Sequence, residues 1–178
     1  MDLKILAMTD LSYQAAIEIR PAVPEDAGGI TAIFFESAEN HVELDPERYS
    51  TPASETISTR YREGQQHPPH TDSKSITLVA ELSGEVVGFI DGRIEQSSDA
   101  MHREMTYCHI SEIAVRHGHR NQGIGGRLLQ AAEDWGRTMG AEFASLDFHN
   151  ENTRAASFYR WRMGYRPAST TAIKRLKP

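Results

Sequence analysis

The stretch Ile110-Ser-Glu-Ile-Ala-Val-Arg-His-Gly-His-Arg-Asn-Gln-Gly-Ile-Gly-Gly-Arg-Leu-Leu129 predicts a short apolar strand, a basic turn and then an amphipathic helix. Gly123, Gly125 and Gly126 fall at the start of that helix. The first-turn N–H groups of a helix have no partner inside it, and glycines leave these groups uncovered by side chains. Because the helix dipole adds positive potential at the same end, and Arg120 comes just before it, the turn predicts a cradle for a pyrophosphate.

Two common phosphate-binding loops do not fit the glycine spacing. A P-loop needs Lys and then Ser or Thr directly after its last glycine, but Ile124 and Gly125 follow Gly123. A dinucleotide-binding fingerprint needs a third glycine at a position where this chain has Leu128. The pattern that fits is Arg-x-x-Gly-x-Gly, which begins at Arg120.

This pattern resembles the acetyl-CoA loop of the GNAT superfamily of N-acetyltransferases. A second segment, Leu146–Tyr165, resembles the other signature of that family: a strand, an Asn, a helix with Ala-x-x-Phe-Tyr, and a Gly followed by an aromatic residue. The matching residues are Asn152, Ala155 or Ala156, Phe158, Tyr159, Gly164 and Tyr165. Both segments occur in the family's order and at its usual separation, so the resemblance extends over about residues 17–176.

The resemblance implies an α/β fold of the α+β type, with a mixed central sheet of about six to seven strands and about four helices. The fourth and fifth strands of this fold splay apart. Hydrophobic periodicity predicts strands at 17–22, 76–82, 86–94, 105–115 and 143–148, and a last strand or hairpin at 165–167 and 171–176. It predicts helices at about 24–38, 54–63, 123–139 and 152–163, with a loop or short helix at 40–52.

Composition predicts a folded protein of ordinary type. The chain has 178 residues, of which 39% are hydrophobic and 25% charged, which suits an extension at 1–16 and a single domain at 17–178. The net charge of −6 argues against nucleic acid as a partner, because a nucleic-acid surface is basic. One cysteine, no signal-peptide pattern and no apolar run of membrane-spanning length together predict a cytoplasmic protein that does not bind a membrane.

The resemblance implies that acetyl-CoA is the co-substrate of an acyltransferase and that no metal takes part. The pantetheine arm would lie along the strand 113–115, where the splayed strands expose backbone amides. The implied cofactor-binding residues are Ile113, Ala114, Val115, Arg120, Asn121, Gln122, Gly123, Ile124, Gly125, Gly126, Asn152 and Tyr159. Arg154, Arg160 and Arg162 are either further phosphate contacts or a solvated helix face.

Acetyl transfer to an amine needs a base for the amine and an acid for the departing thiolate. Tyr159 matches a family position that often supplies this acid, and core packing between Phe158 and Trp161 is the alternative. Asn152 matches a cofactor-contacting Asn, with a plain helix cap as its alternative.

Glu112 matches a strand position where many relatives place the base, which acts directly or through a water. Strand alternation puts Glu112 on the face opposite Ile113 and on the same face as Ile110. An exposed or ion-paired carboxylate is the alternative for Glu112, and His109 is a second candidate base.

The acceptor is expected to be the primary amine of a small molecule or peptide. The acidic residues Glu36, Glu39, Glu43, Asp45 and Glu47 suit a polyamine, an aminoglycoside or a peptide amine, and a solvated loop explains them equally. Relatives of this kind are often dimers, so a homodimer is one option. The function expected is direct acetyl transfer in a ternary complex. The alternatives are a larger acyl group, or a module that binds acyl-CoA or another protein without catalysis.

Two other chemistries have little support in the spacing. Cys108 has no His–Asp partner that would make it a nucleophile, and a lone cysteine is usually buried filler. The histidine pairs 117/119 and 67/70 have no third ligand at a recognisable spacing for a metal.

Overall fold

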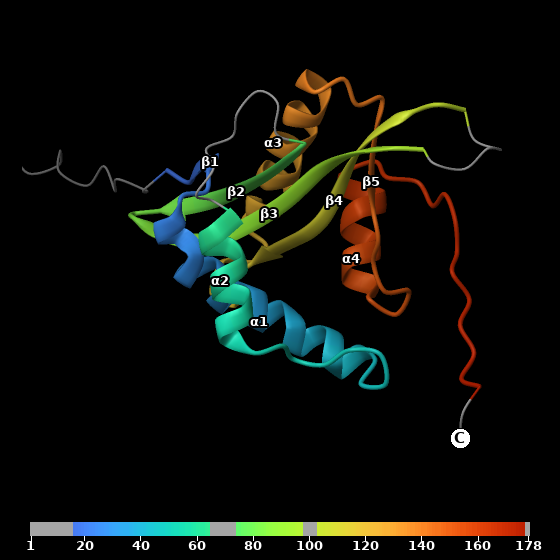
Figure 1. Ribbon diagram of the computed structural model, residues 1–178, viewed down its shortest axis with the longest axis horizontal. Helices are drawn as coiled ribbons and strands as arrows, with labels where there is room; N and C mark the ends of the chain where they lie inside the picture. Colours follow the sequence, from blue (N-terminus) through green and yellow to red (C-terminus); the bar gives the residue numbers. More distant parts are fainter. Residues whose placement is uncertain (1–15, 65–73, 98–102, 177–178) are drawn as a thin grey trace, which may run out of the picture.

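The computed structural model describes residues 16–64, 74–97 and 103–176 and is built on one mixed sheet (Figure 1). Its strands are β1 (Glu18–Pro21), β2 (Ser75–Leu82), β3 (Glu85–Gln96), β4 (Thr106–Val115) and β5 (Phe143–Leu146). They lie side by side in this order; β1 to β4 are antiparallel neighbours, and β5 runs parallel to β4.

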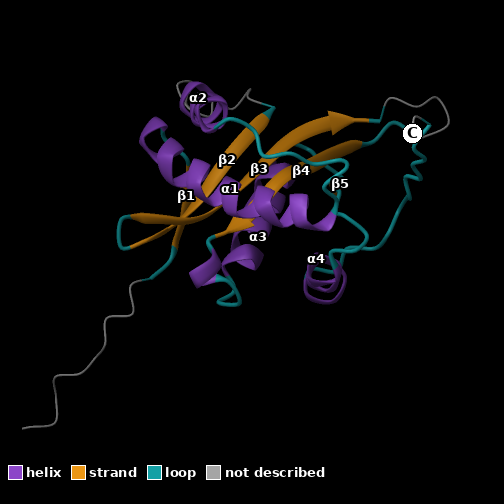
Figure 2. Ribbon diagram, turned by 90° about the horizontal axis from the view of Figure 1, so that it is seen from below, coloured by secondary structure: helices purple, strands orange, loops and turns teal. Residues whose placement is uncertain are grey.

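Helices cover both faces of the sheet. On one face lie α1 (Ala27–Leu44) and α2 (Ser54–Gly64), which bury Ile30, Ile33, Ile57 and Tyr61 against the sheet residue Phe89. The other face carries α3 (Ile124–Thr138), α4 (Thr153–Ser157) and the π-helical segment η3 (Phe158–Arg162) that continues α4. Two single turns, η1 (Pro24–Asp26) and η2 (His117–His119), precede α1 and α3. In Figure 2, α2 lies on one side of the strands and α4 on the other.

The amphipathic pattern of the α3 sequence explains its place in the fold. Ile124, Leu128, Leu129 and Ala132 recur at helical spacing and are fully or almost fully buried against the sheet. The elements and their order confirm the predicted fold class and the four helices, and the short pairing of β5 with β4 confirms the splayed strands.

The predicted number of strands was too high. The described residues form five strands, and the strand or hairpin predicted at 165–167 and 171–176 is absent from them. Residues 166–176 are all exposed, including Ile173 and Leu176, so this segment buries no apolar side chain that would hold it against the sheet. Pro167 also lacks the N–H that a strand ladder requires.

Helix α1 is longer than predicted. The sequence placed a loop or short helix at 40–52, but α1 continues through Asn40 and His41 to Leu44. No glycine or proline interrupts 40–44, and the helix ends just before Pro46, whose ring disfavours helical backbone in the preceding residue. This extension brings new side chains to the site described below.

A β-bulge in β4 corrects the predicted facing of its side chains. Asp91 pairs with Glu112 and Gly92 pairs with Ile110, so Ser111 has no partner residue in β3. The extra residue reverses the alternation. Ile110 consequently lies in the core under α3 and not on the face of Glu112, as the sequence had indicated.

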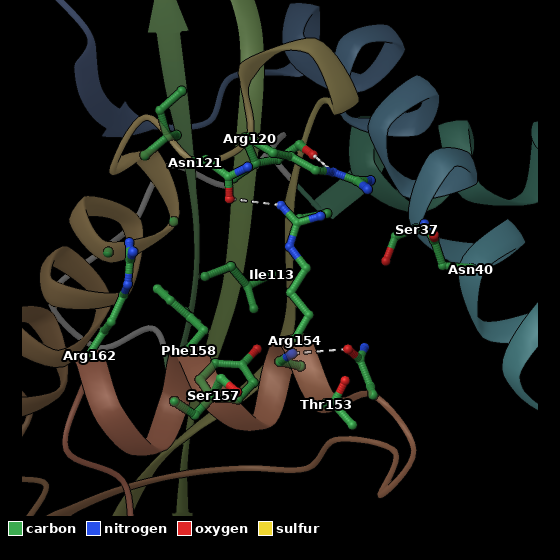
Figure 3. Close-up of a pocket in the computed structure, with 18 of the residues that line it drawn as sticks. Ser37, Asn40, Ile113, Arg120, Asn121, Thr153, Arg154, Ser157, Phe158 and Arg162 are labelled. Carbon is green, nitrogen blue, oxygen red and sulfur yellow. Dashed lines mark hydrogen bonds between the residues drawn. The ribbon is translucent and has the colours of Figure 1, made fainter.

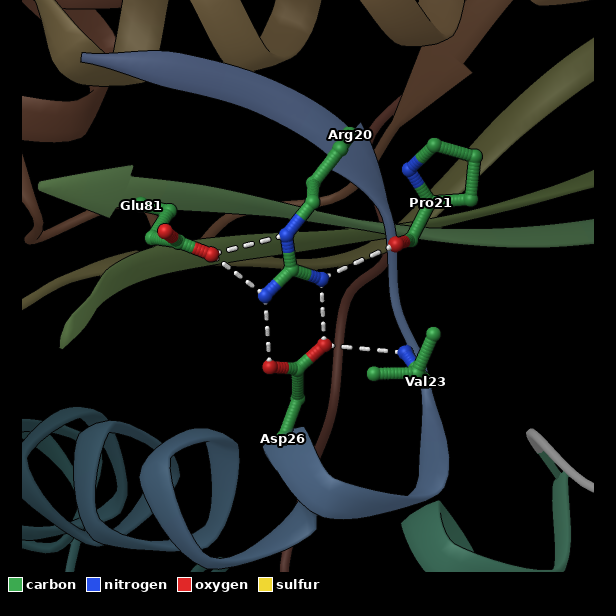
Figure 4. A network of polar contacts seen from close by, with 5 residues as sticks. All are labelled: Arg20, Pro21, Val23, Asp26 and Glu81. Atoms are coloured by element: carbon green, nitrogen blue, oxygen red, sulfur yellow. Dashed lines mark hydrogen bonds and ion pairs between the residues drawn. The ribbon is translucent and has the colours of Figure 1, made fainter. Parts of the chain in front are cut away.

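One partly buried ion-pair network ties the edge of the sheet to the first helical turn (Figure 4). The Arg20 guanidinium donates to Asp26 at 2.6 and 2.9 Å and to Glu81 at 2.6 and 2.8 Å. Burial alone would raise the pKa of Asp26, but hydrogen bonds from Arg20 and from the Val23 N–H outweigh it and lower this pKa. The network fixes the approach of β1 to α1.

Two sequence predictions fall on parts that the structure leaves undescribed. The N-terminal extension 1–16 lies outside the described residues except for Ala16, and so do residues 65–73 of the loop that contains His67 and His70. Among the helices of the described part, none has both the length and the apolar character needed to cross a bilayer.

Close packing of α3 on β4 gives a stability prediction. A Cβ at Gly136 would lie 2.5 Å from the Cβ of Cys108, whereas a Cβ at Gly28 in α1 would meet nothing within 4 Å. We expect Gly136→Ala to lower the free energy of unfolding by about 1–3 kcal/mol, because the helix must shift. Gly28→Ala should raise it by about 0.5–1 kcal/mol through helix propensity. Urea denaturation followed by circular dichroism measures both, and equal effects would contradict the packing argument.

Candidate functional site

The site begins where β4 and β5 part. Their parallel pairing extends from Tyr107 and Phe143 to Ile110 and Leu146, while β4 continues to Val115 (Figure 1). A cleft of about 820 Å³ opens at this point. Its walls come from the C-terminal half of α1, the end of β4, the turn and first residues of α3, and α4 with η3.

The predicted cradle is one wall of this cleft. Gly123 is the N-cap of α3 with φ +82°, and no side chain caps the helix in the described structure. Asn121 also has positive φ, +66°, so the turn folds back sharply before the helix starts. The first-turn amides of α3, which no side chain covers, suit an anion with more than one oxygen.

Three arginines line the same part of the cleft (Figure 3). Arg120 donates from Nε to the Val115 carbonyl at 2.9 Å, which fixes the side chain at the end of β4. Arg154 reaches from α4 to the Oδ1 of Asn121 at 3.1 Å. Arg162 is the third, whereas Arg160 is not among the lining residues. Positive charge thus concentrates around the start of α3.

Asn152 and Tyr159 line the wall of the cleft that α4 and η3 form. The Oδ1 of Asn152 accepts from the Ala155 N–H at 3.0 Å, so Asn152 is the N-cap of α4 as well as a lining residue. Tyr159 is 8% exposed and packs against Phe158 and Phe148. Burial, with the nearby charge of Glu112, raises the pKa of Tyr159 to about 12, so its hydroxyl keeps its proton at neutral pH.

Glu112 lies beside the cleft, on the side of the sheet that α1 and α2 cover. It is partly buried, and it is not itself among the lining residues. Burial raises the pKa of Glu112, the charge of Asp91 raises it further, and His41 and Arg60 oppose that increase. Glu112 is therefore a better proton acceptor near neutral pH than an ordinary glutamate.

All predicted cofactor-binding residues except one line the cleft. The predicted residues from β4, the glycine turn and α4 all line the cleft, but Gln122 does not; its side chain donates to the Gly118 carbonyl at 3.4 Å across the turn. The role of each residue stays a prediction.

Helix α1 supplies one side of the cleft, and of its lining residues the sequence analysis had singled out only Glu43. Ser37, Asn40, His41, Glu43 and Leu44 line the cleft opposite α4. The only sequence signal was the acidic composition of this region, because the length of α1 was underestimated. The ring Nδ1 of His41 lies 2.9 Å from the Ser37 carbonyl, to which it would donate, leaving Nε2 as the free acceptor in a neutral ring.

Other candidates lie away from the cleft. His109 is in the paired part of β4, with its Nδ1 3.2 Å from the Ser145 hydroxyl. Cys108 is buried under α3, where burial and the charge of Glu133 raise its pKa to about 11, the opposite of an activated thiol. The described residues contain no group of three or more side chains placed to hold a metal.

Comparison with known proteins gives one family. Residues 35–165 match the model of the acetyltransferase (GNAT) family. The uncharacterized N-acetyltransferase YhfO of Bacillus subtilis is 37% identical over 86 residues, which are 48% of this chain and 56% of that protein. The streptothricin acetyltransferase of Streptomyces lavendulae is 29% identical over 166 residues, covering 86% of this chain and 84% of that protein. The chain thus spans about half the length of the Bacillus relative.

Solved structures share the fold. A mutant of the Bacillus halodurans protein BH1408 superposes with a TM-score of 0.79 at 21% identity, covering 90% of this chain and 99% of that one. The aminoglycoside acetyltransferase AAC(6')-Iy, in complex with the bisubstrate analog CoA-S-monomethyl-acetylneamine, gives a TM-score of 0.67 at 16% identity. That alignment covers 92% of this chain and 100% of the neighbour.

Proposed function

We propose that the chain, which belongs to the acetyltransferase (GNAT) family and is an acyltransferase, moves an acetyl group from acetyl-CoA to a primary amine. The observation that carries the proposal is the uncapped start of α3, which opens into the cleft where β4 leaves β5. Amides at a helix start and flanking arginines fit the pyrophosphate of CoA. The solved complex of AAC(6')-Iy with a CoA conjugate supports the same choice for a protein of this fold.

The cofactor would enter with its phosphates at Gly123–Gly126 and Arg120, and its pantetheine arm along Ile113–Val115. Asn152 and Tyr159 would then face the thioester end. This arrangement leaves the α1 side of the cleft to the acceptor, so both substrates fit together and transfer is direct. A cytoplasmic location and a homodimeric state stay predictions.

In the proposed reaction, Glu112 takes a proton from the acceptor ammonium, directly or through a water. The free amine attacks the thioester carbonyl, an N–C bond forms, and the C–S bond then breaks. Tyr159 passes its hydroxyl proton to the departing sulfur, and its oxygen takes up the proton that the acylated nitrogen loses on becoming an amide. The products are the amide, the CoA thiol and a neutral Tyr159. The raised pKa of Glu112 suits the first step, since a carboxylate whose pKa is raised above its ordinary value is a stronger base.

For the acceptor we propose a small molecule with more than one amine. Glu43 lines the cleft near the C-terminal end of α1, and Glu151 lines it just before α4. The carboxylates would hold a second ammonium group while the first reacts. Two of the similar proteins are, by their names, acetyltransferases of streptothricin and of aminoglycosides, which supports this choice.

A charge placed in the cradle should abolish cofactor binding. We expect Gly125→Glu to weaken the binding of acetyl-CoA more than tenfold, because its carboxylate repels the phosphates at the uncapped helix start. Gly28→Glu adds the same charge to an exposed site on α1 and should leave the affinity for acetyl-CoA unchanged. Isothermal titration calorimetry with acetyl-CoA, CoA and ATP measures the affinities. No binding of any CoA species by the unmutated protein would contradict the proposed function.

Removal of the Tyr159 hydroxyl should affect turnover and not affinity. We expect Tyr159→Phe to lower kcat about 10²–10³-fold while the Kd for CoA stays within about twofold, since general acids contribute on this scale. Steady-state thiol release and calorimetry provide the two values. A parallel loss of affinity would instead assign Tyr159 to packing.

The carboxylate of Glu43 in the cleft should lower the acceptor KM. With an active amine found by screening polyamines, aminoglycosides and peptides for thiol release, Glu43→Gln should raise the acceptor KM about three- to tenfold at low salt, with kcat little changed. Glu39→Gln removes an equal charge from an exposed position of α1 outside the cleft and is the matched control. Equal effects of both changes would indicate a general field and not a binding subsite. CoA binding without thiol release from any amine would favour the non-catalytic module.

A further inference from the structure

A second carboxylate is buried directly beside Glu112. Asp91 lies on β3, is 7% exposed, and is the cross-strand partner of Glu112 at the bulge. Cross-strand partners point to the same side of a sheet, so the two acidic side chains share the face that α1 and α2 cover. Like charges placed so closely in a buried position cost free energy unless one is neutralised.

Asp91 holds its position through three donors. The Tyr61 hydroxyl donates to Oδ2 at 2.9 Å and the Thr77 hydroxyl donates to Oδ1 at 2.7 Å. An Arg60 nitrogen lies 3.5 Å from Oδ2. Burial raises the pKa of Asp91 above its ordinary value, and these donors offset only part of that increase. Among the described residues, no hydrogen-bond donor to the Glu112 carboxylate is found. When one of the two carboxylates takes up a proton, Glu112 is therefore the one that takes it, and Asp91 keeps its negative charge.

We propose that Asp91 and Arg60 are opposing positioning residues that set the proton affinity of Glu112. Asp91 strengthens Glu112 as a base by holding a fixed negative charge behind it. Arg60 limits this effect, and its side chain is 53% exposed at the surface end of the network. The catalytic meaning of the pair rests on the proposed function, in which Glu112 is the base, but the coupling itself does not.

The other groups that face Glu112 come from separate elements. His41 approaches from α1, Tyr61 from α2 and Tyr159 from η3. The charge of His41 acts in the same direction as Arg60, and the two tyrosines are neutral at neutral pH because burial raises the pKa of each. All three stay unchanged in the variants below, so differences between variants report the substituted charge.

The test is a direct titration of Glu112 in the whole protein without cofactor. Carbon-13 NMR of labelled glutamate side-chain carboxyls, with Glu112→Gln to assign the signal, gives its midpoint. We expect Asp91→Asn to lower the midpoint by about one pH unit, since a like charge is removed. Arg60→Gln should raise it by about half a unit, because its exposed charge is screened. Arg62→Gln changes an exposed arginine of the same helix, whose side chain contacts Ser58, and should leave the midpoint unchanged.

The opposite signs separate electrostatics from damage to the fold. Arg60→Gln alters a half-exposed side chain, so it keeps the proposal testable where Asp91→Asn fails to fold. An unchanged midpoint in Arg60→Gln, or shifts of the same sign in both variants, would overturn the proposal. The acidic limb of kcat/KM should move with the midpoints. If the midpoints shift and no amine is acetylated, the coupling stands and the proposed function fails; acetylation with unchanged midpoints gives the reverse.

Discussion

Strand β4 is paired along its whole length with β3 but only along its first part with β5, and this difference shapes the whole site. On one side β3 stays paired with β4 to Val115, while on the other β5 separates after Ile110. The bulge at Ser111 falls at the same place and adds a residue to β4 alone. Bulges bend and twist the strand that carries them, so the extra residue and the loss of the parallel neighbour go together. The backbone that β5 leaves uncovered becomes the floor of the cleft.

The bulge also sorts the side chains of β4 by chemistry. After the bulge, Ile113 and Val115 pack toward α3, and Ala114 packs toward α1 and α2. Glu112 therefore enters the polar network of Asp91, Arg60 and His41, away from the cradle at the start of α3. One strand thus presents an apolar track to one side and a carboxylate to the other. Without the extra residue, Ile110 would lie on the face of Glu112 and the core under α3 would lose a buried side chain.

The sequence was most informative where a structure depends on residues close together in the chain. The positive φ of Gly123 and the cap formed by Asn152 are set within a few residues, and both could be predicted from local patterns. The bulge could not, because it arises from the register between two strands that differ by one residue. The Asp91 network joins α2, β2 and β3, and no spacing in the sequence indicates that Tyr61 and Thr77 meet there. The absent last strand illustrates the opposite error, because a strand or hairpin was expected at 165–167 and 171–176 and the described residues form none there.

Burial raises the pKa of both proposed catalytic groups, Glu112 and Tyr159, but the increase has a different consequence for each. It raises the pKa of Glu112 and so makes a stronger base. It also raises the pKa of Tyr159 to about 12, far above the value of about 8.5 for an ordinary thiol, so complete proton transfer from Tyr159 to the leaving sulfur is uphill. On the proposed roles, the Tyr159 hydroxyl therefore first stabilises the forming thiolate by a hydrogen bond, and its proton moves to the sulfur as the acylated nitrogen gives a proton to the Tyr159 oxygen. The negative charge of Glu112 contributes to the raised pKa of Tyr159, and this contribution disappears once Glu112 has taken the proton of the amine. The acid is therefore strongest after the base has acted, which is the order that acetyl transfer requires.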